Sequence, residues 1–158
     1  ALLRLIFGVA LGKRGDADAA IGHLQAAEAR RPDFADPPVV LGVLYQEKGL
    51  GDDAVAAYGR ALKADPKNAD AWNNIGAVMH GAEDIPAALQ AFDRAVSLKP
   101  DLVEALNNRG HMRQLLGDLE GAMADYQAVL ALSPSHVKAY LNIAQALKVI
   151  GQKDAAKT

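Results

Sequence analysis

A period of 34 residues runs through the sequence. Four kinds of residue recur at this spacing: a proline, a glycine, an alanine and a large side chain. They are Pro32, Pro66, Pro100 and Pro134; Gly8, Gly42, Gly76 and Gly110; Ala20, Ala54, Ala88, Ala122 and Ala156; and Leu24, Tyr58, Phe92 and Tyr126. Because four series share one phase, we divide the chain into repeats 1–34, 35–68, 69–102 and 103–136, followed by a partial repeat or capping helix at 137–158.

Each repeat is expected to fold as two antiparallel helices, which makes the fold class all-α. Alanine is abundant and loses no side-chain entropy in a helix. The turn signals are Gly15-Asp16, Gly49-Leu50-Gly51, Gly81-Ala82-Glu83-Asp84, Gly117-Asp118 and Gly151-Gln152. A glycine inside a helix costs about 1 kcal/mol against alanine and needs a packing reason. We therefore expect the recurring glycine to face the recurring alanine of the second helix, with Tyr58, Phe92 and Tyr126 filling the gap to the next repeat.

The stretch 69–102 resembles the tetratricopeptide repeat, whose pattern is W-x₂-L-G-x₂-Y, then A-x₃-F, then P. The matching residues are Trp72, Ile75, Gly76, Met79, Ala88, Phe92 and Pro100. The resemblance implies a right-handed superhelical α-solenoid of antiparallel helix pairs, with a concave groove lined by the first helix of each repeat. It also implies that positions 2, 5, 6, 9 and 12 of each repeat face this groove.

The groove positions carry the candidate partner-binding residues. Asn74, Asn108 and Asn142 are spaced by 34, and Asn73 and Asn107 accompany them. Asparagine is unfavourable inside a helix, and this ladder has no packing motive, whereas its amide can bind the main chain of an extended peptide. The alternative is that the amides form a solvated face or an inherited repeat consensus. The remaining candidates are Asp70, Glu104, His111 and Gln145.

Acidic residues in the groove point to the charge of the partner. Asp36, Asp70 and Glu104 occupy equivalent positions and would suit a peptide with basic residues. They do not suit the chaperone-type clamp, in which lysine and arginine bind a terminal carboxylate. The phrases AWNN (71–74) and ALNN (105–108) resemble repeats of O-linked N-acetylglucosamine transferases and SPINDLY-type proteins, in which the repeats precede a glycosyltransferase domain.

The two ends of the chain differ from the middle. Leu2, Leu5, Ile6 and Val9 make the first helix apolar nearly all round, so we expect a preceding repeat, a partner, or self-association to cover it. The chain does not begin with methionine, and we expect a fragment or a processed form. The fifth unit is expected to contribute a capping helix at 137–150 with a polar outer face. Its outward residues would be Lys138, Gln145, Lys148 and Lys153.

Repeat 4 departs from the pattern at two arginines. Arg109 and Arg113 occupy positions 7 and 11, where apolar residues are usual. We expect Met112 to take over the packing role of position 11.

Composition and motifs narrow the chemistry. The net charge of −2 gives no basic excess for nucleic acid or anionic membranes, and the lack of cysteine excludes disulfides and thiolate metal sites. No apolar run approaches the roughly 20 residues of a membrane span. No catalytic or phosphate-binding motif occurs, and two histidines on neighbouring repeats, His80 and His111, are a weak metal signal. We expect no enzymatic activity, cofactor or metal, and a cytoplasmic location with the periplasm as the alternative.

The leading hypothesis is a non-enzymatic protein–protein interaction scaffold that binds a peptide segment or a partner in the concave groove. The first alternative is the substrate-recognition arm of a larger enzyme such as a glycosyltransferase. The second is a self-assembling structural subunit that uses its apolar first helix.

Overall fold

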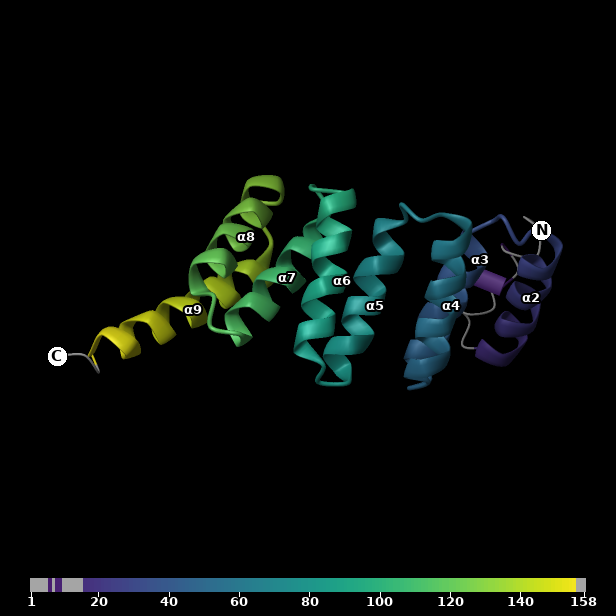
Figure 1. Ribbon diagram of the computed structural model, residues 1–158, viewed down its shortest axis with the longest axis horizontal. Helices are drawn as coiled ribbons and strands as arrows, with labels where there is room; N and C mark the ends of the chain where they lie inside the picture. The colour runs from purple at the N-terminus through teal and green to yellow at the C-terminus, as the bar shows by residue number, and fades with distance from the viewer. Residues whose placement is uncertain (1–5, 7, 10–15, 156–158) are drawn as a thin grey trace. The chain divides into compact units, whose positions relative to one another are not determined.

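The computed structural model describes Ile6, Gly8, Val9 and residues 16–155. In this part of the chain eight numbered helices follow one another and no strand occurs (Figure 1). They are α2 (Ala17–Arg30), α3 (Asp36–Glu47), α4 (Gly51–Ala64), α5 (Ala69–Gly81), α6 (Ile85–Leu98), α7 (Val103–Leu115), α8 (Leu119–Leu132) and α9 (Val137–Ala155). They fall into two compact units, Ala1–Val78 and Met79–Thr158, whose boundary lies inside α5.

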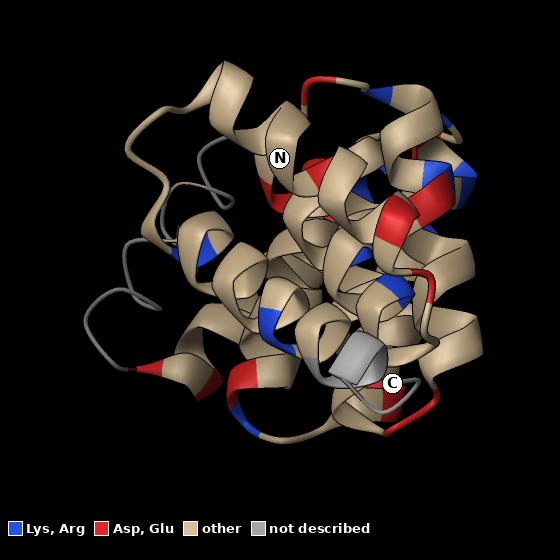
Figure 2. Cartoon of the chain, turned by 90° about the vertical axis from the view of Figure 1, so that its left-hand side faces the viewer, with Lys and Arg blue, Asp and Glu red and all other residues tan. Residues whose placement is uncertain are grey.

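The fold is of the all-α helical repeat class, as the 34-residue period predicts. Repeats 2, 3 and 4 each contain one helix pair, namely α3 and α4, α5 and α6, and α7 and α8. Within the first unit α3 packs on α4 and on α2, and within the second α7 packs on α6 and α8. Figure 2 shows that basic and acidic positions are interspersed along the helices.

The second helix of most repeats begins at an aspartate. Asp16, Asp84 and Asp118 occupy the same repeat position, and each carboxylate accepts a hydrogen bond from the backbone N–H three residues on, at 3.2, 3.1 and 2.9 Å. Each bond satisfies one of the N–H groups that a helix start leaves without a partner. Repeat 2 has Leu50 at this position and lacks the side-chain cap.

The turn between the two helices of a repeat requires a left-handed backbone. Gly49, Glu83 and Gly117 occupy the same repeat position and have φ angles of 74°, 63° and 85°. Glycine adopts this conformation freely, whereas any side chain costs about 1–2 kcal/mol there. Repeat 3 therefore carries a strained glutamate where its neighbours carry glycine.

The recurring glycines allow close packing of the two helices, as predicted. A Cβ on Gly42 would overlap the ring of Tyr58, and a Cβ on Gly110 would lie 2.7 Å from Cε1 of Tyr126. Both tyrosines are fully buried. The expected alanine is wrong for Gly42 and Gly110, whose nearest atoms belong to the aromatic ring of the same repeat. At Gly8 the nearest atoms are those of Leu24, and the backbone oxygen of Ala20 follows at 3.2 Å.

Each unit has its own apolar core. In the first, Ala20, Leu24, Leu41, Leu44 and Ala57 form one cluster. In the second, Ala88 and Phe92 of α6 meet Met112 of α7, which is buried. The prediction that Met112 replaces Arg113 as a packing residue is confirmed.

The last helix differs from the prediction. α9 continues without a break through Gly151, so the turn expected at Gly151-Gln152 is wrong. Lys138, Gln145 and Lys148 are exposed, but they share the surface of α9 with large apolar residues, which contradicts a polar cap. The exposed apolar residues of α9 are Val137, Tyr140, Leu141 and Leu147. The side chain of Lys153 lies outside the described part of the chain.

Only part of the predicted apolar first helix can be described. Leu2 and Leu5 lie outside the described residues, Ile6 is 56% exposed, and Val9 is half-buried. Among the residues that the structure describes, no helix combines the length and apolar character that a membrane crossing requires.

Candidate functional site

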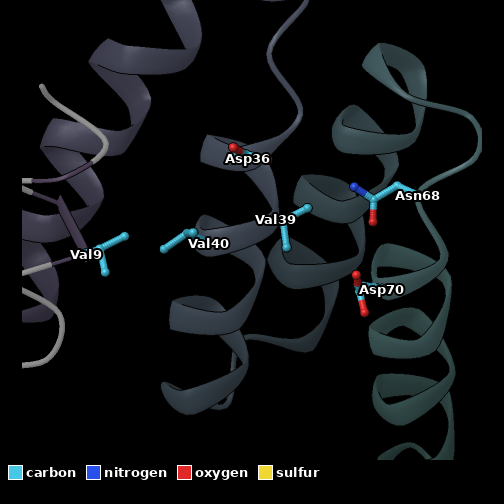
Figure 3. A pocket seen from close by; sticks show the side chains of 6 residues that line it. All are labelled: Val9, Asp36, Val39, Val40, Asn68 and Asp70. Atoms are coloured by element: carbon cyan, nitrogen blue, oxygen red, sulfur yellow. The ribbon is translucent and has the colours of Figure 1, made fainter. Parts of the chain in front are cut away.

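A pocket of about 310 Å³ opens in the first unit between the starts of α3 and α5. The described residues that line it are Val9, Asp36, Val39, Val40, Asn68 and Asp70 (Figure 3). Figure 3 shows Val9 and Val40 facing each other on one side, with Asn68 and Asp70 on the other side and Val39 between them. The pocket therefore combines an apolar wall with polar and acidic groups.

Local sequence explains how these side chains come to the pocket. Pro37 and Pro38 open α3, where proline is tolerated because the first turn lacks backbone acceptors, and both rings are buried. Their burial leaves Asp36 exposed at the start of the helix and sets Val39 and Val40 on the following turn. Asp70 is exposed in the first turn of α5. The partial positive charge of a helix N-terminus favours a carboxylate at both places.

The orientation of Asn68 is fixed by the helix it caps. Its side-chain oxygen accepts a hydrogen bond from the backbone N–H of Ala71 at 2.9 Å. The amide nitrogen is then directed away from α5, and Figure 3 shows it pointing into the pocket. This side chain thus presents a hydrogen-bond donor to an occupant.

Two of the predicted asparagines of the second unit bind each other. Asn107 is buried, with 8% of its surface exposed, and its side-chain oxygen accepts a hydrogen bond from Nδ2 of Asn142 at 3.1 Å. This bond joins α7 to α9 and corrects the view that these amides lack a packing motive. Asn108 on α7 is half-buried.

The remaining predicted residues are distributed over both units. Asn73 and Asn74 are half-buried on α5, in the part that belongs to the first unit. Glu104 on α7 and Gln145 on α9 are exposed in the second unit. The structure thus brings Asp70 to the pocket and joins two of the amides.

His111 faces His80 in the second unit. The two rings lie edge to face with centroids 5.4 Å apart. Burial and the nearby His80 lower the pKa of His111, and its buried Nδ1 has no hydrogen-bond partner among the described residues. The described residues contain no group of three or more His, Asp or Glu side chains that could hold a metal ion.

An ion cluster around Asp125 is one feature that sequence reasoning missed. Arg109 donates two hydrogen bonds to the Asp125 carboxylate, from Nε at 2.9 Å and Nη2 at 2.5 Å, and Arg113 donates a third from Nη1 at 2.9 Å. Arg109 also bonds Asp93 of α6 at 3.3 Å. Burial alone would lower the pKa of Arg109, but the bonds and charges of Asp125 and Asp93 raise it above its ordinary value. The cluster ties α6, α7 and α8 together. Its signal in the sequence was the two arginines at usually apolar positions, which did not reveal which acids they bind.

A second missed pattern couples positions 12 and 24 of the repeat. The hydroxyl of Tyr58 donates to Gln46 at 3.2 Å, and the hydroxyl of Tyr126 donates to Gln114 at 2.9 Å. Repeat 3 has His80 and Phe92 at these positions. His80 has no tyrosine of its own repeat to bind, and its ring instead contacts His111.

The helix pairs, and the glycine beneath an aromatic ring in repeats 2 and 4, define a helical repeat protein. Sequence profiles of the tetratricopeptide repeat family match residues 39–103 and 75–148, which together cover more than half of the chain. The chain belongs to the tetratricopeptide repeat family, as its sequence pattern predicts. The resemblance of its repeats to those of glycosyltransferases stays a prediction.

Solved structures share this fold. The crystal structure of MamA superposes with a TM-score of 0.81 at 24% identity, over 93% of this chain and 86% of MamA. The first tetratricopeptide domain of Spaghetti (RPAP3), bound to the HSP90 peptide SRMEEVD, gives 0.71 at 26% identity, over 74% and 93%. YrrB, a tetratricopeptide protein with an unusual peptide-binding site, gives 0.77 at 24% identity, over 94% and 76%. No curated protein sequence matches the chain.

Proposed function

We propose that this chain is a non-catalytic interaction module. In this proposal the first helices of its repeats bind an extended peptide segment of a partner protein. The observation that carries the proposal is the position of the pocket. Five of its six described lining residues, all but Asn68, occupy repeat positions 2, 5, 6 or 9. These are the positions that the family resemblance assigns to the groove.

The chemistry of the pocket supports a peptide as the occupant. Its valines can bury side chains, and the Asn68 amide can donate to a main-chain carbonyl. The RPAP3 domain, whose solved structure is bound to a peptide, supports the same class of partner. The half-buried Asn74 of the same unit would extend the contact to further main-chain groups.

Display of random 12-residue peptides against the full chain tests the proposal. Selected peptides should bind the parent chain and lose affinity several-fold with Val39→Gln, because this change places a polar group in the apolar wall. Val55→Gln is the matched control, since Val55 is also half-buried but lies on α4, away from the pocket. Equal losses for both variants, or no selected peptide at all, would refute the proposed site.

The asparagines have a test of their own. Asn74→Ala should weaken a selected peptide, because it removes an amide of the first unit that can bind the main chain of the peptide. Asn142→Ala is less informative, since it also breaks the hydrogen bond to Asn107. Unchanged affinity of Asn74→Ala would remove this amide from the binding site.

A further inference from the structure

We infer that the pocket of the first unit selects a lysine or arginine side chain of the bound peptide. This inference rests on the proposed function and adds the chemical identity of one residue of the partner. A basic side chain has an aliphatic stem and a charged end, and the stem can lie along apolar surface while the charge stays near water. The pocket offers the complementary pair of surfaces.

The stem is accommodated by the valines. Val9 and Val40 face each other across one side of the pocket, and Val39 continues the apolar wall toward α5 (Figure 3). All three side chains are half-buried, so an occupant would remove their remaining surface from water. Burial of this apolar surface favours a long aliphatic chain over a short polar one.

The charged end is accommodated by the carboxylates. Asp36 and Asp70 make no ion pair with any described residue, and no basic side chain is among the described residues that line the pocket. Other acids of the same unit are paired: Asp18 with Lys48 at 2.5 Å, and Glu28 with Arg60 at 2.6 Å. The two pocket carboxylates therefore leave a negative charge that a cation of the partner can neutralise.

The main chain of the partner has a donor beside this charge. Nδ2 of Asn68 points into the pocket because the oxygen of the same amide is held by Ala71. A backbone carbonyl next to the basic residue can accept from it. The geometry thus specifies a carbonyl, an aliphatic stem and a cation in one place.

The same charges select against acidic peptides. The peptide SRMEEVD in the RPAP3 structure contains three acidic side chains. An acidic side chain placed in the pocket would meet Asp36 and Asp70, and like charges that lie close together repel. The pocket should therefore reject the three acidic side chains of such a peptide and accept only its arginine.

Fluorescence anisotropy with matched peptides tests the inference. A peptide from the display selection would be synthesised with lysine, arginine, norleucine, glutamine or glutamate at each position in turn. At one position lysine and arginine should bind about tenfold more tightly than norleucine, which has a similar stem without charge. The ratio should shrink as NaCl rises from about 0.05 to 0.5 M, because salt screens the charges.

Charge variants of the chain locate the effect. The double variant Asp36→Asn with Asp70→Asn should bind lysine and norleucine peptides equally. The matched control is Asp52→Asn with Asp53→Asn, which removes the same charge from the exposed first turn of α4 and should retain the preference. Loss of the preference in the control would show that net charge, and not the pocket, selects the peptide, and would overturn the inference.

The remaining outcomes separate the two proposals. If lysine and norleucine peptides bind the parent chain equally at all positions, the inference fails while the proposed function stands. If no peptide binds, both fail. Light scattering over a concentration series adds one more test. If the chain forms dimers that the Asp36 and Asp70 variants abolish, and binds no peptide, the carboxylates contact a second copy of the chain. That result would overturn the inference.

Discussion

Asp125 is the carboxylate on which the ion cluster of the second unit converges, and its charge can be removed with little change of shape. Only 4% of its side chain is exposed, and three guanidinium N–H groups donate to it. In Asp125→Asn one oxygen would be replaced by an amide nitrogen, so that an N–H donor of the new side chain would face an N–H donor of an arginine. The charges of Arg109 and Arg113 would lose this partner.

The size of the effect follows from burial. Removing one member of a buried ion pair costs about 3–5 kcal/mol, because the partner charge is left desolvated. Glu28→Gln is the matched control, since Arg60 also makes a two-point contact with Glu28, at 2.6 and 3.3 Å. Because 42% of the Arg60 side chain is exposed, that change should cost below about 1 kcal/mol.

Urea unfolding followed by circular dichroism measures both variants, and native-state hydrogen exchange of the α7 and α8 amides locates the loss. Exchange is needed because repeat arrays do not always unfold in one step. Asp125→Asn should lower protection across both helices. If it costs no more than Glu28→Gln, the cluster contributes no more than an exposed pair and the argument from burial is wrong.

The space beneath Tyr126 should not accept a methyl group, so Gly110→Ala should lower the free energy of unfolding by about 1–3 kcal/mol in thermal unfolding. Gly59→Ala, with open space at its Cβ position, should stabilise the protein by up to about 1 kcal/mol. Equal effects of the two changes would contradict the packing. Glu83→Gly should stabilise by roughly 0.5–1 kcal/mol by relieving the left-handed backbone, and an unchanged urea midpoint would refute this. The pKa of His111 is lowered by burial and a neighbouring histidine, so the unfolded state binds more protons below pH 6.5 and stability should fall as the pH drops below that value. His111→Gln should weaken this dependence of stability on pH, and an unaltered dependence would show that another group causes it.

The repeat architecture could be predicted because periodic residues encode local rules. Asp84 and Asp118 cap helices through hydrogen bonds to backbone three residues away, which do not depend on the rest of the fold. Gly42 and Gly110 permit close packing because they lack a side chain, whatever the neighbouring group is. The identity of that group could not be predicted, because spacing places a residue on a face and does not say which neighbour its side chain reaches. The aromatic ring therefore replaced the expected alanine.

The candidate site was predictable in part for the same reason. Asp70 reached the pocket, because the repeat position places it at the exposed start of α5. Asn107 did not remain open, because its burial depends on Asn142, which lies 35 residues away in the next repeat. Pairs such as Arg109 and Asp125 were equally hidden, since an arginine in an apolar position is explained only by the acid on the neighbouring helix.

The exposed face of α9 has a consequence for how the array can be extended. Tyr140, Ala144 and Leu147 occupy the positions at which α7 presents Leu106, Gly110 and Arg113, and α8 packs over the last two. α9 thus offers a ready docking surface for a further helix of the same design. In a linear array each added interface contributes its own free energy, so a synthetic segment with the α8 pattern, fused after α9, should raise the melting temperature without redesign of the existing repeats.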